Sequence, residues 1–324
     1  MLLPLLLLAS APTVAVLSTS HDTTELRFQP LAPTLAPVVA RLRHDEGSGV
    51  RGALLPGSRA VLVVAQLAPA RDASWASSLV RLEEGALPRV LAEELALGSA
   101  PLVTREGRVF VARGRAGPPT ERLRVDSLSI DEVNPGTGKL RTVYSARGSL
   151  LFLAGAIGRE LVVYAIDELG GRLLAVHVDT LAVRTVKERF APLAHDFSVE
   201  GKRVLFTLGA QGSETSRVVT LEDGVERELA RADSVALLPF ALPDGRATWV
   251  PSFTAPVTVL GGGALFASHG AYDRLRFVRD GVAYGVTEVP GEFSSGFAVR
   301  LEGARALPFP TAPNARIELA GVTP

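Results

Sequence analysis

Residues 196–208 read DFSVEGKRVLFTL: a short apolar run, a turn at Gly201, and a second run rich in Val, Leu and Phe. Strand residues on both sides of a glycine turn are typical of a β-hairpin, because tight hairpin turns need positive φ angles that glycine adopts without steric cost. The stretch therefore predicts two antiparallel strands joined at Gly201.

The same hairpin recurs along the chain. It reads LLPGSRAVLVVA from Leu54, LVTREGRVFVAR from Leu102, LAGAIGRELVVYAI from Leu153, FALPDGRATWV from Phe240 and RFVRDGVAYGV from Arg276. The six turn glycines are Gly57, Gly107, Gly158, Gly201, Gly245 and Gly281, and they lie 50, 51, 43, 44 and 36 residues apart. An Arg or Lys follows the glycine in most copies, and we expect it to be solvated at the end of a strand.

A second hairpin follows each of these units except the one near Gly245. Its copies are LVRLEEGALPRVL from Leu79, LSIDEVNPGTGKLRTV from Leu128, LLAVHVDTLAVRTV from Leu173, RVVTLEDGVERELA from Arg217 and FAVRLEGARALPF from Phe297. Four short strands in about 40 to 50 residues are typical of a propeller blade. A helix competes only at residues 87–97, so we predict an all-β propeller of four-stranded blades.

The ends of the chain offer material for one more blade. Residues 315–322 (ARIELAGV) form a strand-like run at the C-terminus, and residues 25–28 and 38–42 supply apolar strands ahead of the first hairpin. Joining both ends in one blade would close the ring. We therefore prefer seven blades to six, and we expect the blade between Gly245 and Gly281 to be the one that lacks a strand.

The hairpin resembles the TolB-like, or WD-repeat-like, bacterial β-propeller repeat, which typically reads Ser-Pro-Asp-Gly-Lys before an apolar strand. The copy Leu242-Pro243-Asp244-Gly245-Arg246 matches best, followed by Ser198-Val199-Glu200-Gly201-Lys202, and the other four copies keep only the glycine. The resemblance spans roughly residues 50–310 and implies a fold. The envelope partner role of that family comes only by analogy, and we expect no counterpart of its N-terminal α/β domain.

Composition narrows the classes of function. The 324 residues carry 34 Lys+Arg against 34 Asp+Glu, so no basic surplus points to nucleic acid. The absence of cysteine excludes disulfides, thiol catalysis and a lipid anchor on Cys. A content of 47% hydrophobic and 21% charged residues suits a chain with a buried core.

The N-terminus points to export. Residues 1–17 (MLLPLLLLASAPTVAVL) are uncharged and too short for a membrane span of about 20 residues, which suits the apolar region of a signal peptide. Cleavage could follow Ala15 or Ala11, although Pro12 disfavours the second site. A buried strand over residues 13–18 is the alternative. We expect a signal peptide over residues 1–15, one propeller domain over residues 20–324, no stable span after processing, and a periplasmic or extracellular location.

No catalytic motif accompanies the repeats. The five histidines, His21, His44, His177, His195 and His269, lack the spacing of a metal site, and no G-x-S-x-G elbow is present. His195 and Asp196 are the candidate channel residues, because they fall at the start of an innermost strand. We expect no metal and no cofactor.

Two classes of function remain. The first is a non-catalytic, protein-binding or scaffold module of the cell envelope, with another envelope or secreted protein as partner. The alternative is a propeller hydrolase or lyase with its site in the central channel, or a small-ligand binding protein. Convergent ionisable groups at one channel mouth would favour the alternative.

Overall fold

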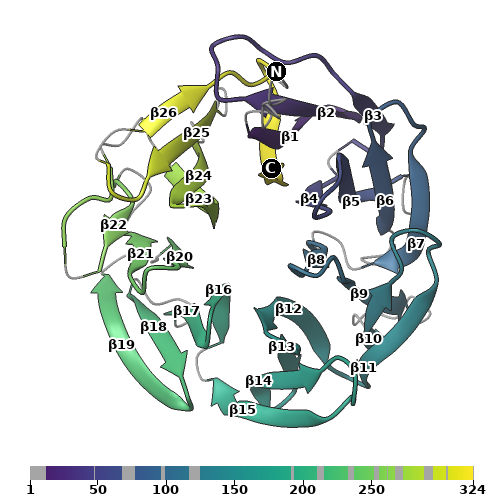
Figure 1. The fold of residues 1–324 in the computed structure, drawn as a ribbon. Coiled ribbons are helices and arrows are strands. Elements are labelled where there is room, and N and C mark those ends of the chain that lie inside the picture. The colour runs from purple at the N-terminus through teal and green to yellow at the C-terminus, as the bar shows by residue number, and fades with distance from the viewer. Residues whose placement is uncertain are drawn as a thin grey trace, which may run out of the picture.

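The computed structural model confirms an all-β propeller. It describes residues 12–46, 48–67, 77–95, 99–116, 125–190, 193–209, 215–232, 237–251, 255–260, 262–266, 273–287, 295–303 and 306–323. Every element in these ranges is a strand, and the strands surround a central axis (Figure 1). In the described part of the chain, no helix is long and apolar enough to cross a membrane.

Hydrogen-bonded sheets define the blades, which we number along the chain. Blade 1 comprises β27 (Arg316–Val322), β1 (Thr13–Ser20), β2 (Thr23–Pro30) and β3 (Ala40–Arg43). Blade 2 comprises β4 (Arg51–Leu54), β5 (Ala60–Gln66), β6 (Ser77–Glu83) and β7 (Arg89–Leu95). Blade 3 comprises β8 (Leu102–Val103), β9 (Val109–Ala116), β10 (Val125–Val133) and β11 (Leu140–Ala146), and a Leu95–Arg113 pair joins it to blade 2.

The second half of the ring repeats this plan. Blade 4 comprises β12 (Leu150–Ile157), β13 (Glu160–Asp167), β14 (Gly170–His177) and β15 (Val183–Phe190). Blade 5 comprises β16 (Ala194–Glu200), β17 (Arg203–Gly209), β18 (Ser216–Glu222) and β19 (Val225–Ala232). Blade 6 has three described strands, β20 (Leu237–Ala241), β21 (Ala247–Val250) and β22 (Thr258–Val259), and blade 7 comprises β23 (Asp273–Arg279), β24 (Val282–Thr287), β25 (Ser295–Arg300) and β26 (Ala306–Phe309).

This grouping is consistent with the seven blades expected from the repeats. Within the described ranges the short blade is the one between Gly245 and Gly281, where a missing strand was expected. Residues 87–97 contain no described helix, because β7 occupies Arg89–Leu95.

The core lies between neighbouring blades. Alternate residues of β5 face opposite sides: Val61 and Val63 join the cluster with blade 1, whereas Leu62 and Val64 join the cluster with blade 3. Seven such clusters lie between successive blades and continue around the ring. Each buried Val or Leu contributes about 1.5–3 kcal/mol to stability. Because these side chains are buried between blades, each blade depends on its neighbours for its stability.

The two ends of the chain meet in blade 1. Strand β1 pairs with β2 on one side and with β27 on the other, so the ring closes by hydrogen bonds between chain ends. The hydroxyls of Thr13 and Thr323 lie 2.7 Å apart, and the Thr323 amide donates to the Thr13 carbonyl at 2.9 Å. Residues 25–28, 38–42 and 315–322 therefore lie in one closing blade, as expected, but the strand that pairs with β27 is β1, which the expected closing blade did not include.

Strand β1 overlaps the segment in which a signal peptide is expected. It begins at Thr13, upstream of the expected domain boundary at residue 20, and Val14, Ala15, Val16 and Leu17 are buried in it. Cleavage after Ala15 would remove the first three residues of this strand, whereas cleavage after Ala11 would leave it whole. Residues 1–11 of the expected leader lie outside the described residues.

Candidate functional site

The six turn glycines define one face of the ring. Their φ angles lie between 57° and 94°, the positive region that the repeat pattern requires. Each follows the innermost strand of its blade, and strands alternate in direction across a blade, so the β6–β7, β10–β11, β14–β15 and β18–β19 turns lie at the same end. We call this the turn face, and the opposite end the loop face.

A hollow of about 1020 Å³ opens at the centre of the turn face. Its walls come from blades 1, 2, 3, 6 and 7, through residues that include Pro56, Arg105, Asp244, Arg276 and Glu318. This volume is at the upper end of the range for small-molecule pockets, about 300–1,000 Å³. The mixture of charged and apolar walls suits a polypeptide segment as well as a small polar molecule.

Glu318 joins three blades in the wall of this hollow. Its Oε2 lies 2.6 Å from Arg276 Nη2 on β23 and 3.5 Å from Arg51 Nη1 on β4. The three side chains are only 12%, 20% and 26% exposed, in the order Glu318, Arg276, Arg51. One carboxylate on the closing strand therefore bridges the blades on either side of it.

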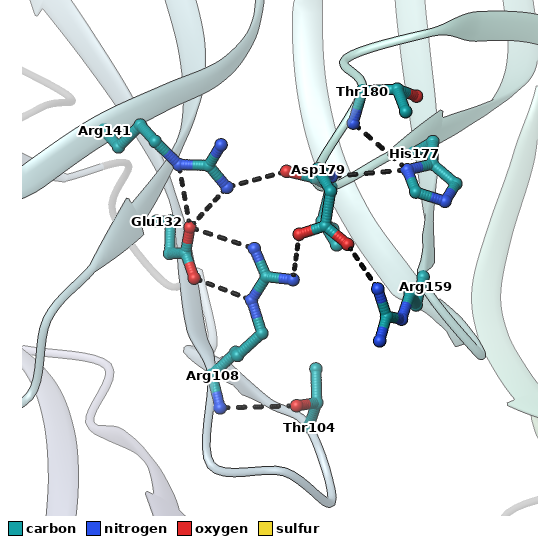
Figure 2. A network of polar contacts seen from close by, with 9 residues as sticks. Thr104, Arg108, Glu132, Arg141, Arg159, His177, Asp179 and Thr180 are labelled. Atoms are coloured by element: carbon teal, nitrogen blue, oxygen red, sulfur yellow. Dashed lines mark hydrogen bonds and ion pairs between the residues drawn. The ribbon is translucent and has the colours of Figure 1, made fainter.

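A second network joins blades 3 and 4 at the turn face (Figure 2). Arg108, directly after turn Gly107, donates to both oxygens of Glu132 at 2.7 and 3.1 Å and to Asp179 at 2.9 Å. Arg159, directly after turn Gly158, donates to the other oxygen of Asp179 at 3.0 Å. The carboxylate of Asp179 thus lies between an arginine from each of the two blades.

Arg141 completes this network from β11. It donates to Glu132 at 2.6 and 3.0 Å and to the Val178 carbonyl of the β14–β15 turn at 2.6 Å. The hydrogen bond from Arg108 is the main reason that the pKa values of Glu132 and Asp179 are held below their usual range. Both carboxylates are consequently ionised at neutral pH.

The candidate residues His195 and Asp196 lie on β16, the innermost strand of blade 5, near the loop face. His195 Nε2 and Asp196 Oδ2 are 3.7 Å apart, and both side chains remain about a third to two fifths exposed, at 42% and 32%. Burial raises the pKa of Asp196, although His195, the Leu238 backbone and Arg274 oppose that effect.

The backbone at this place is unusual. Asp196 and Leu238 have φ angles of 52° and 53°, and the strand register shifts beside each of them. Left-handed geometry at a leucine costs of order 1–3 kcal/mol and is found at functional sites as well as in turns. The position lies where the innermost strands of blades 5 and 6 meet, away from the turn-face hollow.

Among the described residues, the other histidines do not converge with His195. His44 is buried and hydrogen-bonds Thr24 at 2.9 Å, whereas exposed His21 lies near Glu46. His177 belongs to the β14–β15 turn, and His269 lies outside the described residues. Within the described ranges, no three His, Asp or Glu side chains gather closely enough to hold a metal ion.

Sequence reasoning missed the two arginine–carboxylate networks. Arg51 and Glu318 are 267 residues apart, and Arg108 and Asp179 are 71 residues apart, so no local spacing pairs them. The available signal was the basic residue after the turn glycine. The expected solvation is wrong for Arg108, whose side chain is only 26% exposed because it bridges two blades.

Comparisons with known proteins support the fold and leave activity open. No protein-family model and no curated protein matches the chain. Among solved structures, TolB from Acinetobacter baumannii is 12% identical with a TM-score of 0.52, over 96% of this chain and 67% of that one. A puromycin hydrolase is 13% identical with a TM-score of 0.54, over 81% of this chain and 47% of that one.

The β-propeller domain of the Trilobed protease from Pyrococcus furiosus is a further match, 13% identical with a TM-score of 0.51, over 82% of this chain and 84% of that domain. That domain has an open velcro topology, whereas β27 pairs with β1 here. At these identities the matches show the fold alone. The chain has the β-propeller fold that TolB shares, and it spans less than half of the puromycin hydrolase.

Proposed function

We propose that this chain is an exported, non-catalytic β-propeller of the bacterial cell envelope that binds a partner protein at its turn face. The observation that carries the proposal is the central hollow of about 1020 Å³, which residues of five blades surround. Its charged groups are held in place by ion pairs such as Glu318 with Arg276, so the surface is preformed.

Export is part of this proposal. The apolar segment before Thr13 supplies a leader, and cleavage after Ala11 leaves β1 intact for ring closure. The envelope setting follows the TolB-like resemblance. A periplasmic or secreted partner, with no nucleic acid, cofactor or lipid anchor, fits the balanced charge and the cysteine-free sequence.

Site-specific photo-crosslinking tests the binding face. A photoreactive amino acid replaces exposed Pro56, which lines the hollow, or exposed Arg147, which follows β11 toward the loop face. In cells that export the protein, we expect a discrete protein adduct from position 56 and none from position 147. Adducts from position 147 alone, or from neither position, would overturn the proposal.

The alternative is an enzyme or small-ligand site in the channel near the loop face. It is supported by the raised pKa of Asp196, its 3.7 Å approach to His195 and the strained backbone at Leu238. Asp196→Asn in the purified protein tests this reading: loss of a hydrolytic or eliminating activity toward glycoside, ester or peptide substrates would support it. Absence of any activity in the parent protein would count against it.

A further inference from the structure

A second, smaller pocket lies on the turn face between blades 3 and 4. It has a volume of about 370 Å³ and shares Thr104 with the wall of the central hollow. Its inner surface is apolar, because Phe110, Leu161 and Val178 line it and are at most 3% exposed. An apolar floor beside the main opening has the form of a binding hot spot, which one well-packed side chain can fill.

The rim of this pocket is charged. Arg108, Arg159, Glu106 and Asp179 line it, and Arg105 follows Thr104 in the adjacent wall of the hollow. Asp179 already accepts from Arg108 and Arg159. The hydrogen bonds of Glu106 to its own backbone and to Thr104 hold the pKa of that carboxyl below its usual range.

The arginines of the rim have more capacity for a ligand than its carboxylates. The side chains of Arg159 and Arg105 are 78% and 90% exposed, and a guanidinium carries five N–H donors. Arg159 uses Nη1 toward Asp179, and Arg105 approaches Glu200 only at 3.6 Å. Donors that face solvent can engage a carboxylate at small desolvation cost and in bidentate geometry.

We infer that this pocket is the specificity site for the partner. It takes one aliphatic or aromatic side chain of an extended segment, while a neighbouring Asp or Glu of that segment binds Arg159 and Arg105. The inference rests on the proposed partner-binding function and adds the chemistry of the bound segment. Arg108 acts as a positioning residue, because it holds the Glu132 and Asp179 walls in register.

A random peptide library displayed on phage is the probe, selected on the purified full-length chain. We expect enriched peptides to place an apolar residue next to Asp or Glu. Arg159→Glu should weaken their binding about tenfold or more, because it removes a charge-assisted hydrogen bond to the acidic residue. Changing the acidic peptide residue to Lys should restore binding to that variant.

Two further variants test whether binding depends on the pocket itself rather than on a change of charge anywhere on the protein. Ala156→Leu narrows the pocket from β12 and should reduce binding without a change of charge. Arg147→Glu makes the same charge change away from the turn face and should leave binding unchanged. Thermal unfolding of each variant establishes that it is folded before binding is compared.

Several outcomes would overturn the inference: no enriched peptide, a preference for Lys or Arg, or binding insensitive to both Arg159→Glu and Ala156→Leu. The proposed function is judged separately by the photo-crosslink at position 56. If a partner still crosslinks at position 56 in an Arg159→Glu background, the pocket is not the specificity site. The proposal that the partner binds at the turn face would remain supported.

Discussion

Two turns of the network have the same backbone geometry but different side chains. In the β10–β11 turn, Asn134 N donates to the Lys139 carbonyl and Asn134 O accepts from Gly138 N. In the β14–β15 turn, His177 makes the same bonds with Ala182 and Leu181.

The side chains of the first residues of the two turns, Asn134 and His177, also accept equivalent hydrogen bonds. Asn134 Oδ1 accepts from the amides of Gly136 and Thr137, both at 2.9 Å. His177 Nδ1 accepts from the amides two and three residues later, those of Asp179 and Thr180, at 3.3 and 3.2 Å (Figure 2). One turn therefore depends on an amide oxygen as acceptor, and the other on an imidazole nitrogen.

The residues at the fifth position of the two turns, counted from Asn134 and His177, differ as well. Gly138 and Leu181 both have positive φ, at 78° and 60°. Glycine adopts this geometry freely, whereas a leucine there costs roughly 1–2 kcal/mol. Both turns are held from outside, the β10–β11 turn by Arg89 on the Pro135 and Gly136 carbonyls and the β14–β15 turn by Arg108 and Arg159 on Asp179. Only the β14–β15 turn must offset a left-handed leucine with such contacts.

The largest effect is expected from exchanging the fifth residues. A Cβ at Gly138 would meet the Leu91 carbonyl oxygen at 2.9 Å, so Gly138→Leu adds a close contact to the left-handed strain. We expect a loss of about 2–3 kcal/mol in the free energy of unfolding, measured by urea titration. Leu181→Gly should change stability little or raise it. Equal losses in both variants would contradict the comparison.

A smaller effect is expected from Glu132, which joins the two turns through Arg108 and Arg141. Glu132→Gln should cost about 1–2 kcal/mol near neutral pH. Because the pKa of Glu132 is lowered in the folded state, its contribution is present above about pH 4.5 and is lost as the pH falls through the folded value. Urea unfolding across this range should therefore show a shallower acid dependence in the variant. An unchanged slope would contradict the role given to Glu132.

The smallest effect concerns His177 itself. His177→Ala removes the Nδ1 acceptor, so the amides of Asp179 and Thr180 should exchange faster with solvent. Hydrogen exchange, corrected for intrinsic rates, measures this.

His177→Asn provides the matched control for that measurement. Its side-chain oxygen can accept as Asn134 Oδ1 does, so the amides of Asp179 and Thr180 should stay protected in this variant, and those of Gly136 and Thr137 should stay protected in both variants. Unchanged exchange of Asp179 and Thr180 in His177→Ala would contradict the role given to the His177 side chain.

The hairpins were predictable because their signal is local. Gly201 and its five counterparts mark turns whose positive φ angles the structure contains, and blade 6 was expected to be short from the 36-residue interval. Strand β1 was given only as an alternative to the leader, because an uncharged apolar run can enter a membrane translocation path or a core. Its burial depends on β27, some 300 residues away along the chain.

The site residues also divide into those that the local sequence predicts and those that only the tertiary structure brings together. The sequence alone placed His195 and Asp196 at the start of an innermost strand, and whether they act as a site stays a prediction. It could not bring Glu318 to Arg51, or Asp179 to Arg108, because these contacts follow from ring closure and blade stacking.

The sequence by itself determined an all-β chain of glycine hairpins, without cysteine chemistry and with balanced charge. These are properties of residue type and short spacing, which the backbone obeys locally. Only the tertiary structure decided which arginines share a carboxylate, where the hollow and the pocket lie, and that the chain closes through β1. Those depend on contacts between distant residues, whose geometry exists only once the ring has formed.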